Sequence, residues 1–154
     1  MDGSRGLIIA GMGAALVLAV TLLAYRTPAP LPADAPPTAF SAIRARAILK
    51  DLVGDGVPHP IGSAANAQVR DRIVKRLSAL GYTTELQTGV ACNAFGECGT
   101  PTNVIATRGA VAGDAVMIAA HYDSVPSGPG ASDDGVGVAN LLEIARILTL
   151  LPPT

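Results

Sequence analysis

The longest apolar stretch of the chain lies near its N-terminus, at residues 7–25, and contains no charged residue. At about 1.5 Å rise per residue, a helix of this length nearly matches the ~30 Å hydrocarbon core of a bilayer. We therefore expect a transmembrane signal-anchor helix at residues 7–25, preceded by a short tail at residues 1–6. A cleaved secretory signal is the alternative, although its apolar core is typically only about 7 to 15 residues long.

Two helical patterns follow a proline-rich segment. Alternating prolines in residues 26–37 favour an extended, semi-rigid linker. Apolar residues then recur at helical spacing from Thr38, the expected N-cap, to Gly54. A second helix is expected before Gly81, with its charged residues facing solvent. Its apolar stripe consists of Val69, Ile73, Leu77 and Leu80.

Beyond this point the polar and apolar residues alternate with a period near two. Residues 82–91 and 102–109 predict strands separated by a loop that contains both cysteines. Residues 115–120 are all apolar and too few for a helix, so they predict a central strand buried on both faces. Residues 136–151 predict a buried helix. This order of elements indicates an α/β sandwich with at least one parallel crossover.

Charge and cysteine content narrow the function classes. The net charge is −1 and there is no basic block, which argues against nucleic acid as a partner. Cys92 and Cys98 are spaced unlike the cysteines of a zinc site. In an exported domain we expect them to form a local disulfide, with two free thiols as the alternative.

The candidate chemistry lies directly after the predicted central strand. His121 and Asp123 follow that strand, at the edge where open α/β sheets bind ligands. A carboxylate two residues along a strand points the same way, so Asp123 is the candidate catalytic residue that orients the imidazole. A loop rich in glycine and proline leads to Asp133 and Asp134 at the next helix. His121 and Asp133 are therefore candidate metal ligands.

Each of these residues also has a simpler interpretation. A histidine at a strand end often only donates or accepts hydrogen bonds, and Asp133 or Asp134 before a helix is often an N-cap. Ser124 and Ser127 lack the G-x-S-x-G motif of serine hydrolases, and the glycines match no nucleotide-binding motif. The metal interpretation depends on the combination of strand, H-x-D, glycine-rich loop, D-D and helix.

That combination, HYDSVPSGPGASDDGVGVANLLEIARIL, resembles the signature of the family-28 zinc metallopeptidases, which are aminopeptidases. The segments HPIGSAANAQVRDRIVKRLSALGY and PTNVIATR are also similar, especially to the membrane-anchored branch that resembles endoplasmic reticulum metallopeptidase 1. The resemblance covers residues 40–151. It implies an α/β/α sandwich with a mixed, mostly parallel sheet flanked by helices, of which residues 38–154 would form an incomplete, N-terminal part.

The resemblance also implies roles for individual residues. His121 matches a ligand of one zinc, Asp123 the carboxylate that orients it, and Asp133 the carboxylate that bridges two Zn²⁺ ions. Asp134 matches the residue joined to Asp133 by a cis peptide bond. The family's Glu-Glu pair and its later Asp and His have no match, since Glu143 lies within the helix. We therefore expect a fragment that is inactive alone.

For the intact protein, the resemblance implies a zinc-dependent exopeptidase. Such an enzyme hydrolyses N-terminal peptide bonds of peptides or proteins through a water activated by two zincs. We expect a single-pass membrane protein with the peptidase domain on the non-cytoplasmic side. The main alternative is a catalytically inactive, membrane-tethered homologue that acts as a binding module. A cyclase or carboxypeptidase activity and a structural calcium site at Asp133 and Asp134 are further alternatives.

Overall fold

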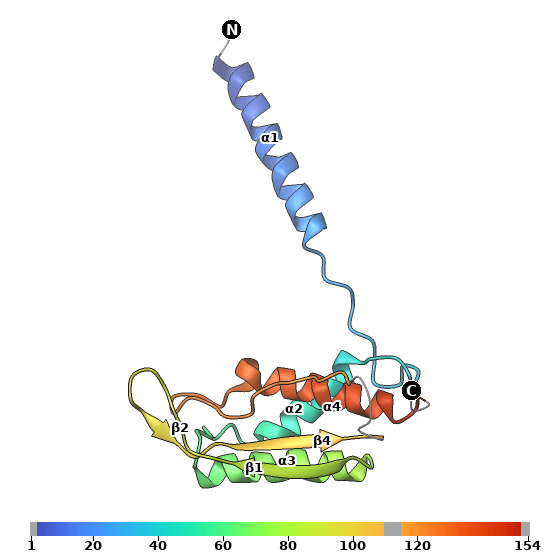
Figure 1. Ribbon diagram of the computed structural model, residues 1–154. Coiled ribbons are helices and arrows are strands. Elements are labelled where there is room, and N and C mark those ends of the chain that lie inside the picture. The colour runs from blue at the N-terminus through green and yellow to red at the C-terminus, as the bar shows by residue number, and fades with distance from the viewer. Residues whose placement is uncertain (1–2, 110–114, 152–154) are drawn as a thin grey trace.

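The computed structural model describes residues 3–109 and 115–151 of the chain. Its first element, helix α1 (Gly3–Ala24), stands apart from the other helices and strands (Figure 1). Residues 4–24 are all exposed, and the segment Ser4–Ala24 has a mean hydropathy of 2.5. By length and composition this helix can cross a membrane, a test that a secretory signal also passes, so the anchor at residues 7–25 stays a prediction.

The proline-rich segment is extended only in part. Its second half and the residues that follow, here called the strap (residues 31–41), fold back onto the start of helix α2 (Ala42–Val53). The side chains of Ser41 and Arg44 hold the strap by hydrogen bonds to backbone carbonyls, those of Leu31, Pro32, Ala33, Ala35 and Ala39. The strap is thus part of the globular domain rather than a free spacer.

Three helices form most of the core. The N-cap of helix α2 is Ser41, whose hydroxyl accepts a hydrogen bond from the Arg44 amide, so the prediction of Thr38 as the N-cap is wrong by three residues. Helix α3 (Ala64–Ala79) lies where it was predicted, and α4 (Val136–Leu148) begins where it was predicted but ends three residues earlier than Leu151. The apolar side chains that they bury together with α2 are Leu52, Val69, Ile73, Leu77, Val138, Leu142 and Ala145.

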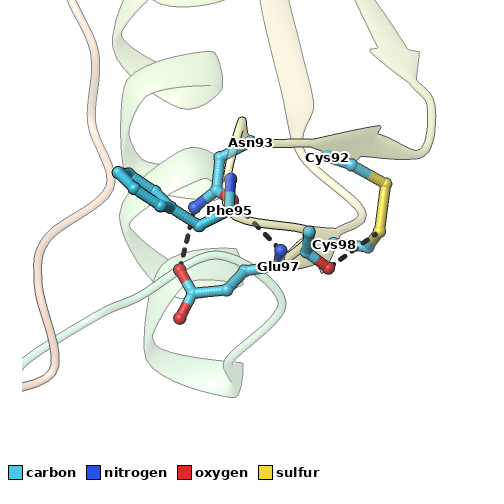
Figure 2. Close-up of a disulfide and its surroundings, with 6 residues drawn as sticks. Cys92, Asn93, Phe95, Glu97 and Cys98 are labelled. Atoms are coloured by element: carbon cyan, nitrogen blue, oxygen red, sulfur yellow. Dashed lines mark hydrogen bonds between the residues drawn. A yellow bond between two sulfur atoms is a disulfide. The ribbon is translucent and has the colours of Figure 1, made fainter.

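Two small antiparallel sheets complete the described domain, and the α/β class is confirmed. Strand β1 (Thr83–Thr88) pairs with β4 (Thr102–Thr107) along its whole length. Between them a hairpin of β2 (Ala91–Cys92) and β3 (Cys98–Gly99) is closed by the Cys92–Cys98 disulfide (Figure 2). The predicted disulfide is therefore confirmed.

The prediction of a buried central strand at residues 115–120 is wrong for this structure. The segment forms no strand, and Val116 and Met117 are 94% and 89% exposed. A strand needs a neighbour to satisfy its backbone groups, and among the described residues β4 pairs only with β1. Without such a neighbour, the apolar pattern alone does not produce a strand. The parallel pairing that was expected is absent from both described sheets.

Candidate metal centre

His121 lies between two carboxylates. Its Nε2 is 2.9 Å from Oδ1 of Asp133, and its Nδ1 is 3.3 Å from Oδ1 of Asp123. The structure therefore brings together all three residues that the sequence singled out. The side chains are 50% exposed for His121, 38% for Asp123 and 88% for Asp133, so a dissolved ion can reach them.

The charges around His121 favour a cation at this position. Partial burial lowers the pKa of the imidazole, but the hydrogen bond to Asp133 and the charges of Asp123 and Asp133 raise the pKa more. The net result is a pKa above the usual value for histidine. Two carboxylates that stabilise a proton on the ring would attract a divalent metal ion to the same place by the same Coulomb interaction.

The chain just after Asp123 is fixed by a buried contact with the segment before α3. The amide of His59 donates to Oγ of Ser124 (2.7 Å), and the amide of Ser124 donates to the carbonyl of His59 (3.2 Å). Both residues are buried, and Asn66 at the start of α3 also donates to that carbonyl. His59 and Ser124 thus hold the loop in place, a role that nothing in their spacing indicated.

A tight return loop brings Asp133 back to the histidine. The loop leads into η1 (Ala131–Gly135), a short wide turn before α4. Gly130 has a φ of +62°, and a Cβ on it would lie 2.8 Å from Cβ of Ser124, so only glycine fits there. The amide of Gly135 donates to the carbonyl of Gly130 (2.9 Å), which closes the turn.

The two adjacent aspartates have different partners. Asp133 accepts from the imidazole of His121, whereas Oδ1 of Asp134 accepts a hydrogen bond from the Gly137 amide (3.1 Å) in the first turn of α4. The peptide bond between them is cis, as the resemblance implied. The simpler interpretation, an aspartate that caps the helix, therefore holds for Asp134. The carboxylate of Asp133 contacts His121 instead.

The donor atoms fit part of a zinc site. An imidazole nitrogen and a carboxylate oxygen are both common zinc ligands. Within residues 3–109 and 115–151, however, no group of three or more His, Cys, Asp or Glu side chains could hold a metal. Catalytic zinc usually has three protein ligands and a water, so His121 and Asp133 supply a share of the ligands that such a site requires.

The geometry agrees with a family match that includes the three site residues. Residues 103–153 match peptidase family M28. The resemblance to the M28 peptidases is confirmed. The chain is 34% identical over 99 residues to a vacuolar membrane protease of Laccaria bicolor, covering 56% of this chain and 10% of the relative. It is 54% identical over 39 residues to aminopeptidase YwaD of Bacillus subtilis, covering 25% of this chain and 9% of that protein.

Two solved structures superpose on this chain. A Zn-dependent exopeptidase from Parabacteroides distasonis superposes with a TM-score of 0.65 at 28% identity, covering 73% of this chain and 42% of that chain. A glutaminyl cyclase from Porphyromonas gingivalis superposes with a TM-score of 0.63 at 31% identity, covering 73% of this chain and 41% of the other. The chain thus spans less than half of each solved structure and a smaller share of the curated relatives.

Proposed function

We propose that this chain belongs to a membrane-anchored, zinc-dependent exopeptidase of the aminopeptidase type, which removes residues from the N-termini of peptides or proteins. The observation that carries the proposal is the contact of His121 with Asp133, 2.9 Å apart and open to solvent, within the segment that matches family M28. Aminopeptidase and membrane protease relatives support the same activity.

In this proposal each site residue has a distinct task. His121 would hold zinc, while Asp123 contacts Nδ1 of the ring and so fixes its orientation. Asp133, whose side chain is largely exposed, would supply a carboxylate to a site for two zincs. Bound zinc would lower the pKa of a coordinated water and polarise the carbonyl of the scissile bond.

The remaining ligands and the general base are proposed to come from residues outside this chain. Glu143 is not a candidate, because its buried carboxylate accepts hydrogen bonds from Arg44, Arg146 and the Ser41 amide. We propose that the 154-residue chain alone binds zinc weakly and hydrolyses no peptide. We also propose that residues 7–25 anchor the protein and that the peptidase domain lies on the non-cytoplasmic side.

The test uses the protein expressed from its complete reading frame. Zinc content would be measured by mass spectrometry, and activity with aminoacyl p-nitroanilides, for the wild type and for Asp133→Asn. We expect the substitution to lower zinc occupancy and to reduce kcat/KM by more than about 100-fold, since removing a ligand exceeds the 10–100-fold typical of an outer partner. Glu85→Gln, at an exposed carboxylate on β1, is the control.

An active wild-type protein that purifies without metal and resists chelators would overturn the proposal. Zinc binding without hydrolysis would instead favour the inactive, membrane-tethered binding module.

Glutaminyl cyclase is the second candidate, because a cyclase superposes on this chain at 31% identity. The two activities are distinguished with one substrate, a peptide that begins with glutamine. An aminopeptidase releases free glutamine, whereas a cyclase releases ammonia and leaves a pyroglutamyl peptide of the same number of residues.

A further inference from the structure

Ser124, the residue after Asp123, holds both backbone polar groups of a single distant residue. Its amide donates to the carbonyl of His59 (3.2 Å), and its hydroxyl accepts from the amide of the same histidine (2.7 Å). The hydroxyl also donates to the Val125 carbonyl (3.0 Å), so it serves both as donor and as acceptor. Ser124 and His59 are 6% and 3% exposed, and a polar group left without its partner there is costly.

The partner of Ser124 is itself fixed to helix α3. The carbonyl of His59 accepts a second hydrogen bond, from the buried side-chain amide of Asn66 (3.1 Å). Asn66 lies in the first turn of α3, where its backbone amide donates to Oγ of the N-cap residue Ser63 (3.0 Å). Because α3 is part of the hydrophobic core, these bonds tie the chain just after His121 and Asp123 to the core of the domain.

Ser124 also meets the loop that carries Asp133. A Cβ on Gly130 would lie 2.8 Å from Cβ of Ser124 and 3.1 Å from the carbonyl oxygen of Asp133. The glycine therefore lies between these two residues, where a larger side chain has no room. The two segments that carry the candidate ligands thus meet through their backbones, in addition to the contact between the side chains of His121 and Asp133.

This arrangement bears on how tightly a metal ion can bind. Ligands that are already held at the right separation need little further ordering when the ion arrives, and affinity rises accordingly. The side chains of His121 and Asp133 are half and largely exposed, so packing around them does not supply this order. The buried contacts of Ser124 do supply it, because they fix the chain beside one ligand and limit its distance from the other.

We propose that Ser124 is a positioning residue for the candidate metal centre. Its hydroxyl fixes the segment that contains His121 against the start of α3, and its contact with Gly130 sets how far Asp133 lies from that segment. The inference rests on the proposed zinc-dependent function. It goes beyond a role in holding the loop, because it predicts that metal affinity and metal geometry change when a hydroxyl outside the set of metal ligands is removed.

The first test measures zinc affinity by competition with a chromophoric chelator, using protein from the complete reading frame. Ser124→Ala leaves the buried amide of His59 without its acceptor, so the segment shifts or admits water. We expect zinc to bind about 10-fold more weakly, at the lower end of the roughly 10- to 100-fold range for outer partners of metal ligands. Ser127→Ala, the same change at an exposed serine of the same loop, should bind zinc like the wild type.

A second control separates positioning from a general loss of stability. Ile73 is buried in α3 about two turns beyond Asn66, so Ile73→Val loosens the core without touching the site. Ile73→Val and Ser124→Ala should both lower the midpoint of thermal unfolding, but only Ser124→Ala should weaken zinc binding.

Cobalt gives a readout that does not depend on affinity or on activity. With the proteins saturated with Co²⁺, the visible absorption of the ion reports the geometry of its ligands. We expect Ser124→Ala to change the position or the intensity of the absorption band, whereas Ile73→Val and Ser127→Ala keep the band of the wild type.

The outcomes separate the two levels of inference. If the wild type binds zinc and Ser124→Ala matches Ile73→Val in zinc affinity and in the cobalt band, the positioning role is wrong and the proposed function stands. A wild type that binds no zinc contradicts the proposed function, and the role of Ser124 with it.

Asn66→Ala keeps the test decisive if Ser124→Ala does not fold. This change removes only the second donor to the His59 carbonyl, so every bond of Ser124 itself remains. We expect it to weaken zinc binding in the same direction but by less. A zinc affinity equal to that of Ser127→Ala would then overturn the proposal.

Discussion

At the scale of single residues, the contact between Asp123 and Nδ1 of His121 decides which ring nitrogen is left for a metal. We expect Asp123→Ala to weaken zinc binding by roughly 10- to 100-fold, because the imidazole loses the partner that fixes its orientation. Asp123→Asn, which keeps a hydrogen-bond acceptor, should have a smaller effect. Competition with a chromophoric chelator measures both, with Glu85→Ala as the control, and equal affinities for all variants would exclude the positioning role.

Glu143 is the other residue whose environment is unusual. Its side chain is fully buried between Arg44 and Arg146, and it also accepts a hydrogen bond from the Ser41 amide at the end of the strap. Hydrogen bonds from Arg146 lower its pKa, burial opposes them, and those from Arg44 and Ser41 lower it further, so the pKa falls from 4.5 to about 2. The carboxylate thus joins α4, α2 and the strap.

This shift predicts a pH dependence of stability. The folded protein holds the Glu143 pKa below its unfolded value, so the stabilisation is complete above about pH 4.5 and is lost as the pH falls towards 2. Between pH 6 and pH 2 the wild type should lose up to about 3 kcal/mol more than Glu143→Gln. Urea denaturation in micelles, followed by tyrosine fluorescence, measures the difference. Parallel losses in both proteins would contradict it, and Glu85→Gln should behave like the wild type.

At the scale of elements, the helices were more predictable than the strands. The stripe of Val69, Ile73 and Leu77 fixes the buried face of α3 through local spacing alone, and the structure buries all three. Residues 115–120 depend on hydrogen bonds to a neighbouring strand, which no local pattern supplies. The start of α2 was misplaced because Thr38 and Ser41 are both good caps, and only the strap decides between them.

The candidate site was also predictable only in part. The residue types and the H-x-D spacing were enough to select His121, Asp123 and Asp133. The contact of His59 with Ser124 was not predictable, because it joins segments 65 residues apart through the backbone of His59 and the amide and hydroxyl of Ser124, and no local pattern links the two.

The first turn of α4 gives a test of how an element and the site depend on each other. Alanine normally stabilises a helix relative to glycine by about 1 kcal/mol. At Gly137, however, the position of a Cβ is occupied by the carboxylate of Asp134. We expect Gly137→Ala to lower the unfolding free energy by about 1 kcal/mol or more and to weaken zinc binding, since Asp134 must move next to Asp133. Thermal denaturation with and without zinc measures both effects.

The matched control is Gly128→Ala, because no atom lies within 4 Å of its Cβ position. Its stability should remain within about 0.5 kcal/mol of the wild type. A Gly137→Ala protein that is more stable than the wild type would show that Asp134 moves freely.

At the scale of the whole molecule, the strap shortens the tether between the anchor and the domain. Only residues 25–30 separate α1 from the strap, and six extended residues reach at most about 20 Å. If α1 spans a bilayer, the domain is held close to the membrane surface. Under the proposed function, peptides that are themselves bound to that membrane would meet the domain at a higher effective concentration than peptides in bulk solution.

The anchor and the disulfide together predict the side of the membrane on which the domain lies. Disulfides persist outside the cytosol and are rare inside it, so the Cys92–Cys98 bond favours the proposal that α1 places the domain on the non-cytoplasmic side. In sealed vesicles with the cytoplasmic face outward, we expect the domain to resist added protease until detergent is present. Maleimide–polyethylene glycol should add mass only after reduction, since both thiols are otherwise bonded. Labelling without reductant, together with cleavage in intact vesicles, would place the domain in the cytosol.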